Sequence, residues 1–317
     1  MSNTLHLLAL DWGTSSLRGV LLAPDGTVLE QAHTGEGILS VTDHDFEAVF
    51  RRLFGPWLER YPSTIVLAAG MIGSRQGWRE AAYASCPTGF DELADAVVWH
   101  SVDDVRIGFV PGVVVEHATS KTPDVIRGEE IQIFGALDAM NIDSGIFVLP
   151  GTHSKWVQVR DRKIVSFHTY MTGELFALLR HQSILARLMP ASGDPTWPEG
   201  RDAFLRGCAA SGKGALLHDL FAIRASGLFD RLHAHEQPDY LSGLLIGEEI
   251  REALLTLSGP APENVYLVCN DALSDRYRAA LTAHGIEGIA TPANASFTGL
   301  LALANKQGWI ESLPASA

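Results

Sequence analysis

Two short segments of this chain carry residue types that can bind phosphate. Asp11-Trp12-Gly13-Thr14-Ser15-Ser16 ends the first apolar run, and Pro150-Gly151-Thr152-His153-Ser154-Lys155 ends a similar run in mid-chain. In each segment, glycine lets the backbone approach a ligand closely, and the amide and hydroxyl groups that follow can donate hydrogen bonds to phosphate oxygens. Arg18 and Lys155 add positive charge. Phosphoryl transfer uses such donors together with a carboxylate near the metal, which Asp11 could supply.

Each segment alone also has an ordinary structural explanation. Asp11 could form a hydrogen-bonded turn exposed to solvent, and Lys155 could merely keep an edge strand soluble. Two such segments favour the functional interpretation, because a nucleotide site that closes around its ligand needs a phosphate contact from each of two lobes. We therefore expect both segments to contact one triphosphate.

The same order of elements surrounds both segments. Apolar runs separated by turn residues predict three successive strands around each one, at residues 5–10, 17–22 and 27–32 and again at 145–149, 155–159 and 164–167. This coarse repeat predicts two similar α/β lobes, each led by a hairpin. We expect an N-terminal lobe over 1–140, a C-terminal lobe over 141–295, and a closing helix in 296–317 that could pack back on the first lobe.

Helical spacing of apolar residues predicts most of the remaining elements. A helix is expected over 46–57 behind Thr42 and Asp43, which are both plausible N-caps. Further helices are expected over 172–182, 200–210, 216–225, 240–257, 273–284 and 296–305, with short strands over 65–69 and 265–268. Residues 191–200, rich in Pro, Gly and Ser, predict a surface loop.

Composition limits the classes of function. The 317 residues suffice for two domains, and the net charge of −13 argues against a nucleic-acid partner, which would require a basic face. The sequence shows neither a bilayer-length apolar run nor an export signal, so we expect a cytoplasmic protein without a membrane partner. Three widely spaced cysteines predict no disulfide or thiolate metal site. A homodimer is left open.

Five blocks of sequence together resemble one enzyme family. They are LDWGTS at 10–15, AGMIGSRQGW at 69–78, IRGEEIQ at 126–132, LPGTHSKW at 149–156 and MTGELFALL at 171–179. This combination resembles the 2-dehydro-3-deoxygalactonokinase family of the actin/hexokinase-like ATPase superfamily, and the similarity extends from about residue 7 to about residue 305. The resemblance implies an α/β fold of two ribonuclease H-like lobes with an interlobe cleft.

The resemblance also implies an activity and its ligands. A member would use ATP and Mg²⁺ to phosphorylate the terminal hydroxyl of 2-dehydro-3-deoxy-D-galactonate, giving the 6-phosphate in galactose or galactonate breakdown. Asp11 with Gly13, Thr14 and Ser15 would form the first phosphate loop, and Gly151 to Lys155 the second. Asp11 would hold Mg²⁺ directly or through water. Asn270 stands where the family usually has a glycine near the adenosine, which leaves the donor nucleotide less defined.

The general base has three candidates. In related exopolyphosphatases, paired glutamates lie at a similar distance before the second phosphate loop, and one of them activates the nucleophile. By that analogy Glu129 or Glu130 would take the proton from the attacking hydroxyl. Asp11 is the rival, and the pair could instead only stabilise a helix N-terminus.

The substrate carboxylate has two arginine candidates. Arg75 and Arg127 could each bind it with two parallel hydrogen bonds, although they could equally pair with protein carboxylates. Gly70 would let the loop approach a small ligand, and Trp78 could form an apolar wall. Thr172 and Glu174 could face the ligand or simply cap a helix.

Other functions stay open at this point. A phosphohydrolase of the same fold would release phosphate without a sugar acid, and a nucleotide-switched scaffold would bind ATP without turnover. A kinase acting on another 2-keto-3-deoxy sugar acid would share all of these residues, because the sequence does not define the stereochemistry of the acceptor.

Overall fold

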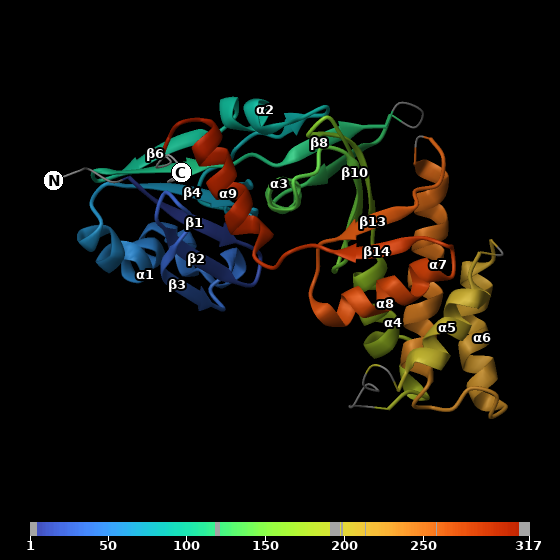
Figure 1. The fold of residues 1–317 in the computed structure, drawn as a ribbon. Helices are drawn as coiled ribbons and strands as arrows, with labels where there is room; N and C mark the ends of the chain where they lie inside the picture. Colours follow the sequence, from blue (N-terminus) through green and yellow to red (C-terminus); the bar gives the residue numbers. More distant parts are fainter. Residues whose placement is uncertain are drawn as a thin grey trace. The chain divides into compact units, whose positions relative to one another are not determined.

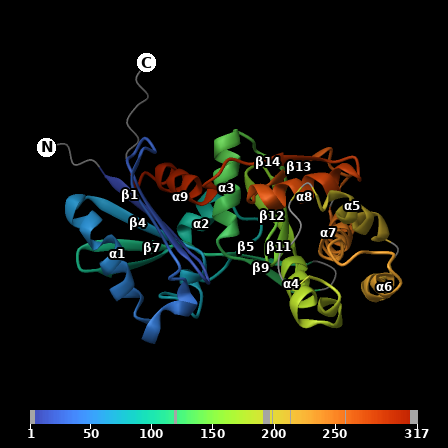
Figure 2. The same ribbon diagram turned by 90° about the horizontal axis from the view of Figure 1, so that it is seen from below.

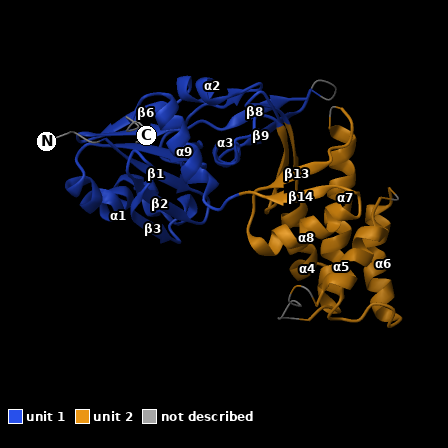
Figure 3. Cartoon of the chain, in the orientation of Figure 1, with its two compact units in different colours: residues 1–144, 159–166, 292–317 blue, residues 145–158, 167–291 orange. Residues whose placement is uncertain are grey.

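The computed structural model describes residues 5–117, 121–190, 197, 199–212, 214–257 and 259–310. The chain divides into two compact units (Figure 3). Unit 1 contains residues 1–144, 159–166 and 292–317, and unit 2 contains residues 145–158 and 167–291. Residues 159–166, expected in the C-terminal lobe, fall in unit 1, where Ile164 forms a bridge with Thr88 and Lys163 pairs with Glu92.

Unit 1 is built on a six-stranded sheet in the order β3-β2-β1-β4-β7-β6 (Figure 1). Strands β1 to β3 pair antiparallel, whereas β4 lies parallel to β1 and β7 lies parallel to β4. The strand bounds are β1 His6–Trp12, β2 Leu17–Leu22, β3 Val28–Thr34, β4 Thr64–Ala69, β6 Val98–Val102 and β7 Val105–Phe109. The expected opening hairpin strands and the strand at 65–69 are confirmed.

The second main sheet repeats this order. It runs β12-β11-β10-β13-β14, with β10, β13 and β14 parallel to one another. Its strands are β10 Gly145–Leu149, β11 Ser154–Arg160, β12 Lys163–Tyr170, β13 Asn264–Leu267 and β14 Glu287–Ala290. In both sheets, three strands that follow one another in the chain lie side by side, and further strands are added parallel to the first of the three. This shared order confirms the predicted repeat and the ribonuclease H-like fold of actin and hexokinase.

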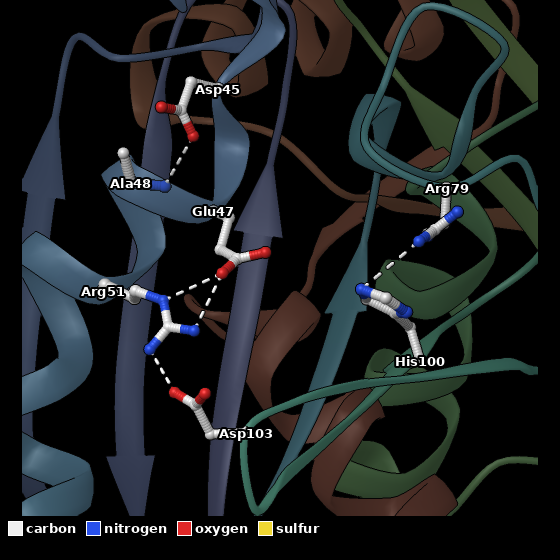
Figure 4. Close-up of polar contacts among 7 residues, drawn as sticks. All are labelled: Asp45, Glu47, Ala48, Arg51, Arg79, His100 and Asp103. Atoms are coloured by element: carbon white, nitrogen blue, oxygen red, sulfur yellow. Dashed lines mark hydrogen bonds and ion pairs between the residues drawn. The ribbon is translucent and has the colours of Figure 1, made fainter.

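Helix α1, Phe46–Arg60, shows one error in the sequence prediction. Asp45 caps it by accepting from the Ala48 N–H at 3.0 Å (Figure 4), so neither Thr42 nor Asp43 is the N-cap. Those two residues lie in a short 3-10 turn, where Asp43 has φ of 53°. Arg51 joins this helix to the β6–β7 turn by pairing with Glu47 and Asp103 (Figure 4).

The alternation of β1 side chains determines which face Asp11 occupies. Leu8, Leu10 and Trp12 belong to the core that α1 covers. Side chains on a strand alternate between faces, so Asp11 lies on the opposite face. There α9 (Ala295–Lys306) packs alongside α3 (Glu129–Met140), as Figures 1 and 2 show. The remaining elements of unit 1 are α2 Phe90–Asp95 and a small sheet of β5 Ala84–Ser85, β8 Val113–Glu116 and β9 Pro123–Ile126.

The helices of unit 2 pack in two hydrophobic cores. Phe204, Ile250 and Tyr277 pack against β10 and β13 in one core, while α4, α6 and α7 share a second core around Leu241 and Leu244. The helices are α4 Thr172–Gln182, α5 Arg201–Ala210, α6 Leu216–Leu228, α7 Gln237–Thr256 and α8 Asp271–Thr282, close to their predicted ranges. The expected loop at 191–200 falls largely outside the described residues. Among the described helices, none is both long and apolar enough to cross a membrane.

Candidate active site

Asp11 lies near the end of β1, and three neighbours define its surroundings. Its Oδ2 pairs with the Arg18 guanidinium and accepts from Ser296 Oγ of α9 at 2.9 Å. A Cβ atom built on Gly70, at the end of β4, would lie 3.5 Å from Asp11 Oδ1. The carboxylate therefore has one oxygen held by the protein and a second oxygen close to Gly70.

The first Gly-Thr loop is fixed through its carbonyl groups. The N–H groups of Ile38 and Leu39 donate to the carbonyls of Gly13 and Thr14 at 3.0 and 3.2 Å. Thr14 and Ser15 are exposed. These two hydrogen bonds hold the backbone of the loop in place and leave the exposed residues accessible to a ligand. Arg18 pairs with Asp11, and its guanidinium lies 5.6 Å from the Phe297 ring centroid.

Two sequence blocks that are far apart in the chain meet in unit 1. Gly70 and Gly128 both have positive φ, 92° and 102°, which favours glycine. A Cβ atom on Gly128 would lie 3.3 Å from Gly70 Cα. The loop after β4 and the N-terminus of α3 are thus in backbone contact, beside Asp11.

The two glutamates of the third block differ in environment. Both begin α3, where Glu129 accepts from the Arg127 N–H at 2.9 Å and Glu130 accepts from the Gly128 N–H at 2.7 Å. Glu129 is half-buried, whereas Glu130 has no exposed surface. Burial raises the pKa of Glu130 to about 8, and the nearby charge of Glu129 adds to the shift. Glu130 is therefore closed to a ligand hydroxyl in this structure.

We expect Glu130 to make unfolding pH-dependent. A glutamate in the unfolded chain titrates near 4.5, so between pH 4.5 and about 8 the folded state holds more protons at this site. The contribution of Glu130 to the free energy of unfolding is fully present below pH 4.5 and is lost as the pH rises from 4.5 to about 8. Between pH 5 and pH 8, the free energy of unfolding of the wild type should fall by roughly 2–4 kcal/mol through this site. The Glu130→Gln variant should not show this fall, because glutamine does not titrate. Urea denaturation of both proteins at the two pH values measures this, and parallel profiles would contradict it.

Arg127 has a guanidinium with spare donor capacity. One terminal nitrogen donates to the Ala81 carbonyl at 2.8 Å, and the group stacks 4.3 Å from the Tyr83 ring centroid. The buried Nε and Nη1 atoms find no hydrogen-bond partner within the described part of the chain. Buried donors without partners are costly, so they point to a ligand or ordered water at this position.

Arg75 and Trp78 lie in different surroundings from Arg127. The Arg75 side chain is 87% exposed and pairs with Glu80 at 3.0 Å, which is the alternative that the sequence left open. Trp78 packs in the core of unit 1 against the rings of Trp12, Phe50 and Phe109. Its indole supports the fold, and an additional contact to a ligand stays a prediction.

The second Gly-Thr loop turns several of its polar side chains toward the protein. Lys155 is 5% exposed and its Nζ donates to the His153 carbonyl at 3.0 Å, so it is not a solubilising residue on an edge. His153 Nε2 lies 2.6 Å from Glu174 Oε2, and the Glu174 N–H donates to the Thr152 carbonyl at 2.9 Å. The N-terminus of α4 is therefore joined directly to this loop.

Gly173 makes that junction possible. A Cβ atom at this position would lie 2.3 Å from the Gly151 carbonyl oxygen and 2.9 Å from Thr152 Cα. Such separations are far below van der Waals contact. Only glycine at residue 173 lets α4 begin this close to the loop.

Beside the same loop, unit 2 contains a cavity of about 230 Å³. Gly151 and Gly173 line one side, and the apolar side chains of Phe176, Leu245 and Leu273 form much of the remaining wall. Arg276, also in the lining, pairs with Asp239 at 2.5 Å. Asn270 caps α8 by accepting from the Leu273 N–H at 3.1 Å, one turn from this wall. Apolar walls with a few polar groups are typical of small-molecule sites.

The structure thus brings the predicted residues together in two groups. In unit 1, Asp11, Gly70 and the start of α3 adjoin one another, and in unit 2 the second loop adjoins Thr172 to Glu174 and the cavity. Three residues of these groups were not predicted from the sequence: Ser296, which contacts Asp11 from 285 residues away, and Asp239 and Arg276 of the cavity. No local sequence signal marks any of the three.

Comparison with known proteins gives one consistent result. The family model for 2-keto-3-deoxy-galactonokinase matches residues 11–303. A protein from Rhizobium meliloti (strain 1021), described as a probable 2-dehydro-3-deoxygalactonokinase, is 33% identical over 313 residues, covering 98% of this chain and 99% of the relative. The 2-dehydro-3-deoxygalactonokinase of Escherichia coli (strain K12) is 34% identical over 295 residues, covering 93% and 95%.

The crystal structure of a Sinorhizobium meliloti protein, described as a putative 2-dehydro-3-deoxygalactonokinase, superposes with a TM-score of 0.83. It is 32% identical, and the match covers 95% of this chain and 99% of that one. The five sequence blocks, the fold and the nearly complete coverage all indicate the same family. This chain belongs to the 2-keto-3-deoxy-galactonokinase family.

Proposed function

We propose that this protein phosphorylates 2-dehydro-3-deoxy-D-galactonate on its terminal hydroxyl, with ATP as donor, to give the 6-phosphate. The observation that carries the proposal is the family match over residues 11–303, which includes all five blocks at the site apart from Leu10. Residues of unit 1 support it, because Asp11 supplies a carboxylate, Gly70 a close backbone approach and Arg127 a guanidinium.

Each Gly-Thr loop, considered within its own unit, offers groups that can bind nucleotide phosphates. Exposed Thr14 and Ser15 offer donors in the first loop, and exposed Gly151 and Thr152 offer backbone groups in the second. The cavity beside Gly151 would take the nucleoside, since its walls are largely apolar and it borders the second loop. Asn270 would contribute to this site indirectly, because it caps α8, whose Leu273 lines the cavity.

Asp11 fits the role of Mg²⁺ ligand. Mg²⁺ in kinases is usually held by one or two carboxylates together with substrate phosphates and water, so one protein carboxylate suffices. Among the described residues, no group of three or more His, Cys, Asp or Glu side chains could hold a metal ion. Bound Mg²⁺ would neutralise charge on the phosphate oxygens.

The chain's own residues would position the acceptor. Arg127 would bind the substrate carboxylate with its guanidinium, which the stacked Tyr83 ring would hold in place. The terminal hydroxyl would attack the γ-phosphorus, the bond to the β–γ bridging oxygen would break, and ADP would leave. The hydroxyl proton would pass to Asp11 or Glu129, because Glu130 is fully buried.

The two arginines give a direct test of substrate binding. We expect Arg127→Ala to raise the KM for the sugar acid about 10- to 100-fold, because a charge-assisted pair is lost. Arg75→Ala should raise it less, since that side chain is 87% exposed and already paired with Glu80. Steady-state kinetics with saturating ATP measures both. A larger effect at Arg75 would transfer the carboxylate-binding role to that residue.

The proposed function is tested by a coupled ADP-release assay with a panel of 2-keto-3-deoxy sugar acids. We expect ADP release to require an acceptor and to be fastest with the galactonate form. Equal or faster turnover with the gluconate epimer would change the assigned substrate. ADP release that does not depend on any acceptor would point instead to a phosphohydrolase.

A further inference from the structure

Glu249 of α7 is a buried carboxylate that collects hydrogen bonds from three other elements of unit 2. Ser154 Oγ and Trp156 Nε1 donate to its Oε1 at 2.7 and 2.8 Å, and the Tyr277 hydroxyl donates to its Oε2 at 2.8 Å. The Thr172 side chain provides a fourth hydrogen bond. Glu249 is 3% exposed, and Ser154, Trp156 and Tyr277 are each 2% exposed or less.

Core packing alone does not account for this arrangement. Burying a carboxylate costs several kcal/mol unless donors surround it, and an apolar side chain would fill the same space without that cost. Here the burial of Glu249 raises its pKa, and the four donors oppose that shift. Because its oxygens already accept these hydrogen bonds, Glu249 has little capacity left to bind a ligand. Its effect is to hold the donor side chains in fixed positions.

Those neighbours are the parts of unit 2 that surround the second phosphate loop. Ser154 belongs to that loop, and Thr172 begins α4, whose Glu174 N–H bonds to Thr152. Tyr277 lines the cavity next to Gly151. One carboxylate therefore joins the loop, the start of α4 and the wall of the cavity.

We propose that Glu249 is a positioning residue for the nucleotide, which fixes the Gly151–Lys155 loop, Thr172 and Tyr277 in the arrangement that binds ATP. This inference rests on the proposed kinase function for the identity of the ligand. It adds a residue that no motif at the loop contains, since Glu249 lies 95 residues beyond Ser154.

The test compares Glu249→Gln with Glu248→Gln. Glu248 is the adjacent residue of α7, and it is a matched control because its carboxylate bonds to Arg251 and to the Gly212 N–H rather than to the loop. Calorimetric titration with MgATP is performed at a temperature where circular dichroism shows all proteins folded. We expect the Kd for ATP to rise about tenfold or more in Glu249→Gln and less than about twofold in Glu248→Gln.

Steady-state kinetics supplies the second measurement. A positioning role predicts a higher KM for ATP in Glu249→Gln and a KM for the sugar acid within about twofold of wild type. A merely structural role predicts a lower melting temperature and unchanged affinity in the folded fraction. Wild-type ATP affinity in folded Glu249→Gln would overturn the inference.

Trp156→Phe keeps the test decisive if Glu249→Gln does not fold. It removes one donor to Glu249 and retains an aromatic ring, so we expect a smaller rise of the Kd for ATP in the same direction; an unchanged Kd would overturn the inference. If wild type binds ATP but phosphorylates no sugar acid, the proposed function fails while the role of Glu249 is still decided by these affinities. A wild type that binds no ATP overturns both.

Discussion

Replacing Asp11 with asparagine is expected to lower kcat about 1,000-fold while the protein stays folded. Asparagine keeps the size of the side chain and an oxygen that can accept from Ser296 Oγ, but it loses the charge that would face Mg²⁺ or the acceptor proton. The lost ion pair is with Arg18, whose side chain is 39% exposed, so the effect on stability should be modest. Steady-state kinetics and a thermal melt measure the two effects.

Ser296→Ala is the matched control for this variant. It removes a hydrogen bond to Asp11 Oδ2 and leaves the carboxylate and its charge, so kcat should fall less than about tenfold. Glu129→Gln, measured alongside, separates the two candidate proton acceptors, because loss of the base alters the pH dependence of kcat. Near-normal turnover in Asp11→Asn would remove Asp11 from the catalytic account.

Gly173→Ala is expected to lower kcat/KM for ATP about 100-fold. The added methyl group would lie 2.3 Å from the Gly151 carbonyl oxygen, and the obstructing atoms are backbone rather than the end of a flexible side chain. Either the second loop or the start of α4 must move, and a shift of about 1 Å in a positioning element can reduce rates by this factor. Kinetics at varied ATP concentration measures the loss.

Gly55→Ala provides the comparison, because it makes the same substitution in α1, where an added Cβ atom meets no heavy atom within 4 Å apart from its chain neighbours and the helix's own backbone. It should leave kcat/KM for ATP unchanged and should keep the helix folded, since alanine favours helix by about 0.5–1 kcal/mol over glycine. If Gly173→Ala retained wild-type kcat/KM for ATP, the second loop would not be part of the nucleotide site.

Much of the fold follows from short-range sequence signals. The hairpin strands around both Gly-Thr segments were predictable because apolar runs alternate with turn residues there, and the repeated strand order confirms the inference of two related lobes. The cap of α1 was misplaced because Thr42, Asp43 and Asp45 are all good capping residues. Only the 3-10 turn ahead of the helix decides in favour of Asp45.

The candidate site was less accessible to sequence reasoning. Asp11 and the two loops stand out through residue type and position, but Arg75 and Arg127 look alike as arginines beside glycines. Their burial separates them, and burial depends on contacts such as Tyr83 and Ala81 that no local pattern encodes. Glu249 and Ser296 were missed for the same reason, because their partners are remote in the chain.

The proposed reaction transfers the γ-phosphoryl group of ATP to the terminal hydroxyl of the sugar acid. Phosphorus NMR of a reaction with MgATP and 2-dehydro-3-deoxy-D-galactonate tests it directly. We expect a new phosphomonoester signal coupled to the two protons of the terminal methylene group, together with ADP. Inorganic phosphate in place of that ester would contradict it.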